Sequence, residues 1–147
     1  MALSEVIGAG PVAVDTALFI YLIEEHPRFL PAVRPLFADA DAGRCRLVTS
    51  AVTLLEVLVV PYRAGDQALG ARYETLLTNS RGLTFVDIDR AQLRAAAQLR
   101  AAYRMRTPDA LQVAAALREG CGTLVTNDRG VRSIPGLRVI QLDRHVE

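Results

Sequence analysis

The sequence predicts an α/β fold, a three-layer α/β/α sandwich with a central parallel sheet. Short β-branched runs alternate along the chain with longer helical patterns, which is typical of a parallel sheet covered on both faces. The chain has 147 residues, 51% of them hydrophobic, which fits one domain over residues 1–147 with a core of ordinary size. No repeat or Pro/Gly/Ser-rich linker divides it.

Five short apolar runs close to turn signals are the expected strands, at residues 11–14, 46–49, 83–87, 123–126 and 138–142. Helical patterns occupy roughly residues 16–25, 31–42, 51–62, 67–79, 90–104 and 108–119. Residues 1–10 have neither the basic start nor the apolar run of a signal peptide, and we expect them to form a flexible extension. Ligands in such sheets gather beyond the carboxyl ends of the strands, so polar residues there are the first candidates for a site.

Composition limits the possible functions. Basic and acidic side chains nearly cancel, 17 against 16, so any contact with nucleic acid must come from local clustering. None of the basic residues is Lys, which excludes a lysine nucleophile, a Schiff base and a phosphate-loop lysine. Cys45 and Cys121 lack the spacing of a zinc site or a disulfide framework. No apolar run reaches the ~18 residues of a membrane span, and we expect a cytoplasmic protein that binds no membrane.

Two aspartates follow predicted strands. Asp15 directly follows Val12-Ala13-Val14, and Asp128 directly follows Leu124-Val125-Thr126-Asn127. The two carboxylates converge at one edge of the sheet if their strands are neighbours. Each aspartate alone is equally well explained as a helix N-cap or a turn residue.

Two further acids lie in helical patterns. Asp109 follows Thr107 and Pro108, and as a helix-start residue it complements the positive end of the helix dipole. Glu56 lies within residues 51–60, which are apolar on nearly every side and are therefore expected to be largely buried. Since a buried carboxylate needs a cation or a proton, Glu56 is expected to lie at an exposed rim, to be protonated, or to lie near a metal ion.

Four carboxylates without Cys or His partners suit Mg²⁺ or Mn²⁺, which prefer oxygen ligands, and do not suit zinc. Neither His26 nor His145 is placed as a general base, which disfavours a Ser-His-Asp hydrolase. A haloacid-dehalogenase-like phosphatase would need an aspartate where the chain has Ala17. A receiver domain would need a lysine, which the chain lacks.

Four segments resemble the ordered motifs of the PIN-domain family, and the resemblance covers nearly the whole chain. Its closer likeness is to the VapC-type toxins of bacterial toxin–antitoxin pairs. The segments are Val12-Ala13-Val14-Asp15-Thr16, Thr49-Ser50-Ala51-Val52-Thr53-Leu54-Leu55-Glu56, Thr107-Pro108-Asp109-Ala110-Leu111-Gln112 and Leu124-Val125-Thr126-Asn127-Asp128-Arg129, together with the tail Ile134-Pro135-Gly136-Leu137-Arg138-Val139. The chain departs from the pattern at Ala17, where many relatives have a small polar residue, and in the ten residues before its first strand.

The resemblance implies a ribonuclease that hydrolyses single-stranded RNA with one or two divalent ions, Mg²⁺ or Mn²⁺. The metal-binding and catalytic acids would be Asp15, Glu56, Asp109 and Asp128, with Thr126 beside them to orient a ligand or a water. Either Glu56 or Asp128 would position the attacking water. The resemblance also implies a homodimer and a cognate antitoxin whose tail blocks the acidic cleft. The alternative is a catalytically silent PIN-fold module that acts by binding a protein or RNA partner.

Residues 90–106 contain five arginines and no acid. At about 100° per residue, Arg90, Arg94, Arg100 and Arg104 fall on one face of a helix, opposite Ala95, Ala96, Leu99 and Tyr103. This basic face is either an ordinary solvated surface or one that steers RNA phosphates.

Overall fold

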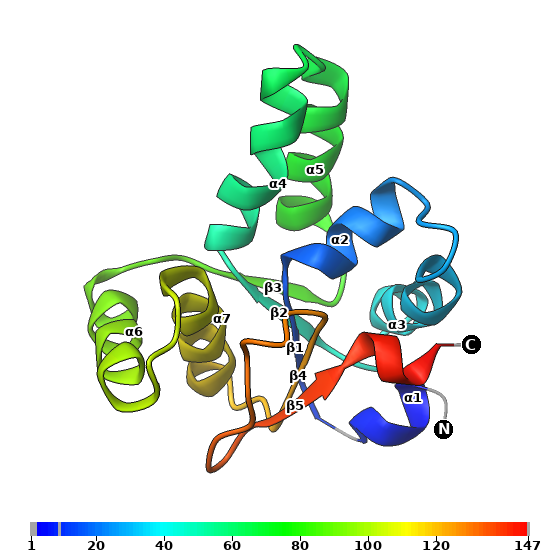
Figure 1. Cartoon of the computed structure of the whole chain (residues 1–147). Helices are drawn as coiled ribbons and strands as arrows, with labels where there is room; N and C mark the ends of the chain where they lie inside the picture. The colour runs from blue at the N-terminus through cyan, green and yellow to red at the C-terminus, as the bar shows by residue number, and fades with distance from the viewer. Residues whose placement is uncertain (1–2, 9, 147) are drawn as a thin grey trace.

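The computed structural model describes residues 3–8 and 10–146 and confirms the α/β/α sandwich (Figure 1). Its strands are β1 (Val12–Val14), β2 (Leu47–Ser50), β3 (Leu83–Val86), β4 (Thr123–Thr126) and β5 (Arg138–Gln141). Its helices are α1 (Leu3–Ile7), α2 (Thr16–Ile23), α3 (Leu30–Asp41), α4 (Val52–Arg63), α5 (Gln67–Asn79), α6 (Arg90–Tyr103), α7 (Thr107–Arg118) and the 3₁₀ helix η1 (Leu142–His145). The predicted boundaries of the five strands and of α2 to α7 differ from these by at most two residues.

The five strands form one parallel sheet in the order β3-β2-β1-β4-β5. From β1 the chain proceeds outward to β2 and β3 on one side, whereas β4 and β5 lie on the other side. The direction of strand order therefore reverses between β1 and β4. Ligands of open parallel sheets bind in the crevice at such a switch point, beyond the carboxyl ends of the two strands.

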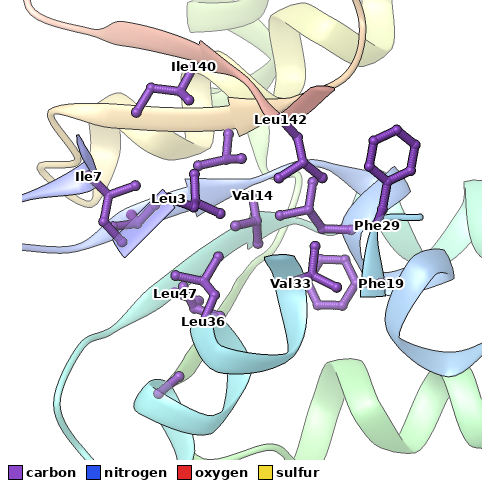
Figure 2. Close-up of a cluster of buried hydrophobic side chains, with 14 of the residues drawn as sticks. Leu3, Ile7, Val14, Phe19, Phe29, Val33, Leu36, Leu47, Ile140 and Leu142 are labelled. Carbon is purple, nitrogen blue, oxygen red and sulfur yellow. The ribbon is translucent and has the colours of Figure 1, made fainter. Parts of the chain in front are cut away.

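Alternation along the strands divides the buried side chains between two cores. Val12 and Val14 of β1 contribute to one core, and Ala13 between them contributes to the other. The first core lies under α1, α2 and α3 and is shown in Figure 2. The second core lies under α6 and α7, on the other face of the sheet. Since both faces are covered, β1 is apolar throughout, and the polar residues Ser50, Thr126 and Gln141 stand at the carboxyl ends of their strands.

Helices α4 and α5 form a hairpin that extends away from the sheet (Figure 1). Helix α4 buries one face, which includes Val52 and Val57. Leu55 and Val60 on its other side are 67% and 66% exposed. The expectation that residues 51–60 are largely buried is therefore wrong for this side of α4, because the helix packs mainly on α2, α5 and α7, which cover its other side.

The N-terminal region differs from the expectation of a flexible extension over residues 1–10. Residues 1, 2 and 9 lie outside the described residues, but Leu3–Ile7 forms helix α1. Its Leu3 and Ile7 are buried in the first core (Figure 2). Arg138 at the start of β5 donates a hydrogen bond to the carbonyl of Val6. This segment is thus part of the packed structure.

One glycine is required by close packing. Gly82, just before β3, has φ +73°, a conformation that side chains with a Cβ rarely adopt. A Cβ at this position would also lie 2.3 Å from the carbonyl oxygen of Ala40 in α3. Its own carbonyl accepts from the amide of Leu47, which joins the starts of β2 and β3.

Candidate functional site

Asp15 lies at the switch point, directly after β1. Its amide donates to the carbonyl of Val125 in β4 over 3.2 Å, so the two neighbouring strands hold the backbone in place. Its side chain caps α2 by accepting a hydrogen bond of 3.1 Å from the amide of Ala17. The other carboxylate oxygen accepts a hydrogen bond from the hydroxyl of Thr126 at the end of β4.

Thr126 links Asp15 to Asp128. Its side chain is fully buried, and its oxygen also accepts a hydrogen bond of 2.9 Å from the amide of Asp128. The Asp128 carboxylate in turn accepts from the amide of Gly130 over 2.8 Å, which shapes the turn after β4. The two strand-end aspartates are therefore held at the same edge of the sheet, as their positions in the sequence suggested, because β1 and β4 are neighbours.

Asp109 reaches this edge from the first turn of α7, where Thr107 begins the helix. Its side chain is 11% exposed. The guanidinium of Arg106 donates to Asp109 over 3.2 Å and also to Asp128. A single cation from the same chain thus bridges two of the four acids.

Glu56 comes from α4 and is half-buried. It accepts a hydrogen bond of 2.6 Å from the hydroxyl of Thr16, the residue after Asp15. Of the three environments expected for Glu56, the partly exposed rim agrees with this position.

A buried polar network lies beneath Glu56 and joins four elements. Thr53 of α4 shares a hydrogen bond of 2.7 Å with Thr49 of β2 and accepts one of 2.7 Å from Gln112 of α7. Gln112 also accepts from the amide of Ser50 over 3.0 Å. Thr16 completes the link to the site at 3.4 Å from Thr53. The network fixes α4 and α7 relative to the sheet, and thereby the acids that they carry.

The four carboxylates influence one another electrostatically. Burial raises the pKa of Asp15 to about 6; the hydrogen bonds from Thr126 and Ala17 oppose this rise, and the negative charges of Glu56 and Asp109 add to it. Burial and the charge of Asp128 raise the pKa of Asp109, although Arg106 opposes the rise. Each acid therefore lies within the field of at least one other.

The donor set fits a hard divalent cation, although the side chains do not surround a point in this conformation. Among residues 3–8 and 10–146, no three His, Cys, Asp or Glu side chains converge closely enough to hold one ion. The guanidinium of Arg106 stands instead between Asp109 and Asp128 as a cation supplied by the chain. In the described part of the chain no ion pair reaches Asp15. The site thus contains a cationic side chain, Arg106, which pairs with Asp109 and Asp128, and a carboxylate, Asp15, that no ion pair reaches among the described residues.

The role of Arg106 could not be predicted from the sequence, because an arginine before a helix start is normally a solvated residue. The family-like motifs contain Thr16, Thr53 and Gln112, but the contacts of these side chains depend on how β2, α4 and α7 meet. The basic face is confirmed for Arg90, Arg94 and Arg100 of α6, which are exposed while Ala96 and Leu99 are buried. Arg104 is also exposed, but it is the left-handed residue that ends the helix. Tyr103, expected on the apolar side, is 47% exposed.

A parallel sheet with an acidic cluster at its switch point defines the architecture of this protein. The family model described as PIN domain matches residues 12–137. The chain therefore belongs to the PIN-domain family. No curated protein matches its sequence.

Solved structures of toxin–antitoxin proteins share this fold. VapBC2 from Rickettsia felis, bound to a promoter DNA fragment, matches with a TM-score of 0.68 at 19% identity, covering 89% of this chain and 98% of that chain. A toxin–antitoxin complex from Klebsiella pneumoniae matches with a TM-score of 0.65 at 22% identity, covering 89% and 97%. VapC20 from Mycobacterium tuberculosis, described as a toxin that cleaves the sarcin–ricin loop, matches with a TM-score of 0.63 at 15% identity, covering 77% and 86%.

Proposed function

We propose that this protein is a metal-dependent endoribonuclease that hydrolyses phosphodiester bonds of single-stranded RNA. The arrangement of Asp15, Glu56, Asp109 and Asp128 around the switch point carries the proposal. Their shared electrostatic field favours binding of a cation at this place. The sarcin–ricin loop activity of the Mycobacterium tuberculosis relative supports RNA as the substrate.

Asp15, Asp109, Asp128 and Glu56 would hold Mg²⁺ or Mn²⁺, both of which prefer carboxylate oxygens and keep several waters. A divalent ion held there would supply Lewis-acid chemistry: it would polarise a phosphate and make a water more acidic. The acid that positions this water would be Glu56 or Asp128.

The residues of the chain have separate tasks in this scheme. Thr126 orients the Asp15 carboxylate and the backbone of Asp128 with one hydroxyl. Thr16 holds Glu56 at the rim. Arg106 neutralises Asp109 and Asp128 in this conformation, so a cation that needs the same carboxylate oxygens would compete with it. Its guanidinium also has the paired N–H donors that suit a phosphate oxygen of the substrate.

We further propose that the protein is the toxin of a toxin–antitoxin pair and forms a homodimer in the cytoplasm. The related structures from Rickettsia felis and Klebsiella pneumoniae are toxin–antitoxin assemblies, which supports an antitoxin as partner. No helix in the described part of the chain is long and apolar enough to cross a membrane.

The test is cleavage of labelled single-stranded RNA by the purified protein with Mn²⁺, with Mg²⁺ and with EDTA. We expect cleavage only with a divalent ion, and its loss in Asp15→Asn and Asp109→Asn, because each substitution removes a charged ligand. Asp66→Asn is the matched control: Asp66 caps α5 by accepting from the amide of Leu69, so the same chemical change occurs at a helix start outside the site. This variant should cut like the parent.

Undiminished cleavage in EDTA would contradict the metal-dependent mechanism. Binding of RNA without cleavage under any of these conditions would instead favour the catalytically silent PIN-fold module.

A further inference from the structure

A cavity of about 300 Å³ lies beside the site, between the turn after β4, strand β5 and η1. Three arginines line it, Arg129 and Arg132 from the turn and Arg144 from η1. Ser133 and Gln141 contribute polar groups to the same wall. We call this feature the arginine pocket.

The arginine pocket carries an excess of positive charge. Arg129 forms an ion pair with Asp143, which neutralises one guanidinium. In the part of the chain that the structure describes, no ion pair forms at Arg132 or Arg144. Guanidinium groups that share a cavity repel one another, and a bound anion relieves this repulsion.

The pocket is attached directly to the proposed active site. Arg129 follows Asp128 in the sequence, and the Gln141 side chain donates to the carbonyl of Asp128 over 3.0 Å. Gln141 also lies within 3.5 Å of the Val131 carbonyl, so it fixes both ends of the turn that carries the arginines. An RNA strand with a phosphate at Asp128 would continue over the surface next to Asp128, and the arginine pocket is part of that surface.

The donors of the pocket suit a phosphate group. Guanidinium groups present paired N–H donors that match two phosphate oxygens. The Ser133 hydroxyl oxygen accepts from the amide of Val139 over 2.9 Å, which leaves its hydrogen free to point at an anion. No aromatic side chain lines the pocket, so it offers no platform on which a base can stack.

We propose that the arginine pocket binds a backbone phosphate of the RNA strand next to the phosphate that is cut. The inference rests on the proposed ribonuclease function. The pocket would hold the strand in place without reading its sequence, since it contacts the phosphate and not the bases. An acidic protein segment is the competing ligand, and the test separates the two.

The experiment measures binding of a fluorescently labelled single-stranded RNA by anisotropy in EDTA, over a series of salt concentrations. The variant is Arg132→Gln/Arg144→Gln. We expect weaker RNA binding. The slope of the logarithm of the binding constant against the logarithm of salt concentration (the salt slope) should be smaller in magnitude by about 0.7 for each phosphate that the protein no longer neutralises. Arg129 is kept, because its ion pair with Asp143 supports the turn.

Arg63→Gln/Arg81→Gln is the matched control. It removes the same charge from two exposed arginines without an ion pair in the described structure, one at the end of α4 and one before the start of β3. Both lie away from the carboxyl ends of β1 and β4. Melting temperatures of the two double variants should match that of the parent, since exposed substitutions usually change stability little.

Equal affinities and salt slopes in the arginine-pocket variant and the parent would overturn the inference while leaving the cleavage test untouched. A different result is also possible: the parent protein cuts no RNA, yet Arg132→Gln/Arg144→Gln still weakens RNA binding. This result would contradict the proposed ribonuclease activity and would support RNA binding in the arginine pocket. Polyglutamate is the probe for the competing ligand. A variant that loses binding to polyglutamate and keeps binding to RNA would assign the pocket to an acidic protein partner, against the inference.

Discussion

At the scale of single residues, Asp15 differs from the other aspartates of the site because no ion pair reaches it in the described structure. Two hydrogen bonds hold its carboxylate, from Ala17 and Thr126. Burial nevertheless raises its pKa from 3.8 to about 6. The folded protein therefore binds a proton at this side chain more readily than the unfolded chain does, between about pH 4 and pH 6.

The stability of the metal-free protein should depend on pH through this residue. Since the folded state binds more protons in this window, the contribution of Asp15 to the free energy of unfolding falls as pH rises through it. Asp15→Asn removes the titrating group and can still cap α2. We expect the variant to melt higher than the parent at pH 7.5 in EDTA, and this advantage to shrink at pH 5.

Thermal unfolding followed by circular dichroism at the two pH values measures this difference. Asp66→Asn is again the control, and its difference from the parent should not change with pH in the same way. A constant difference between Asp15→Asn and the parent would show that the Asp15 carboxylate does not titrate in this range.

Arg106 offers a second test at the residue scale. Its guanidinium bonds both Asp109 and Asp128, so a divalent ion must compete with it for the same oxygens. Exposed ion pairs are weak because solvent screens them. We therefore expect Arg106→Gln to bind Mn²⁺ modestly more tightly than the parent, since the competing cation is gone. Isothermal titration calorimetry without RNA measures this affinity.

Arg118→Gln is the control for this change, because Arg118 forms an exposed ion pair with Asp89 elsewhere. Its affinity for Mn²⁺ should equal that of the parent. Weaker Mn²⁺ binding by Arg106→Gln would contradict competition and would mean that Arg106 positions the two carboxylates for the ion.

At the scale of elements, the buried network around Thr53 connects β2, α4 and α7. Thr53→Val keeps nearly the same shape but removes the oxygen that bonds Thr49 and Gln112. Because Thr53 and Gln112 are almost completely buried, water cannot replace the missing partner. We expect a loss of about 1 to 3 kcal/mol in the free energy of unfolding.

Urea denaturation measures this loss, and the slope of unfolding free energy against urea concentration should stay the same in the variant. Thr78→Val is the matched control on α5, since Thr78 is exposed and its hydroxyl donates to the carbonyl of Glu74. Its effect should be a few tenths of a kcal/mol, as for exposed hydrogen-bonding groups. Equal losses in both variants would mean that the buried network does not stabilise the junction.

The elements also show which features the sequence could predict. Asp15 and Asp128 could be placed together because each directly follows a strand of a parallel sheet, and the carboxyl ends of such strands share one edge. Arg106 could not be placed, because its contacts depend on the distance between the start of α7 and the turn after β4. Helix α1 was missed because five residues are too few to show a helical period. The exposure of α4 was missed because an apolar sequence does not show whether another element covers it.

At the scale of the whole molecule, the site belongs to the folded sheet and not to any local segment. Its acids come from the ends of β1 and β4, from α4 and from α7, so they reach the same edge of the sheet only when the α/β/α sandwich has formed. An ion that binds these acids binds the native state and not the unfolded chain. Such binding stabilises the whole protein in proportion to the logarithm of ligand concentration over Kd.

We expect Mn²⁺ to raise the melting temperature of the parent far more than that of Asp15→Asn. At a concentration of about 100 Kd, binding adds about 2.7 kcal/mol. For a chain of this size each kcal/mol shifts Tm by about 2 to 4 °C, so we expect a rise of roughly 5 to 11 °C. Asp15→Asn begins from a higher Tm in EDTA but should gain little, because it has lost a charged ligand. Asp66→Asn should respond like the parent, and an equal response by Asp15→Asn would remove Asp15 from the proposed metal site.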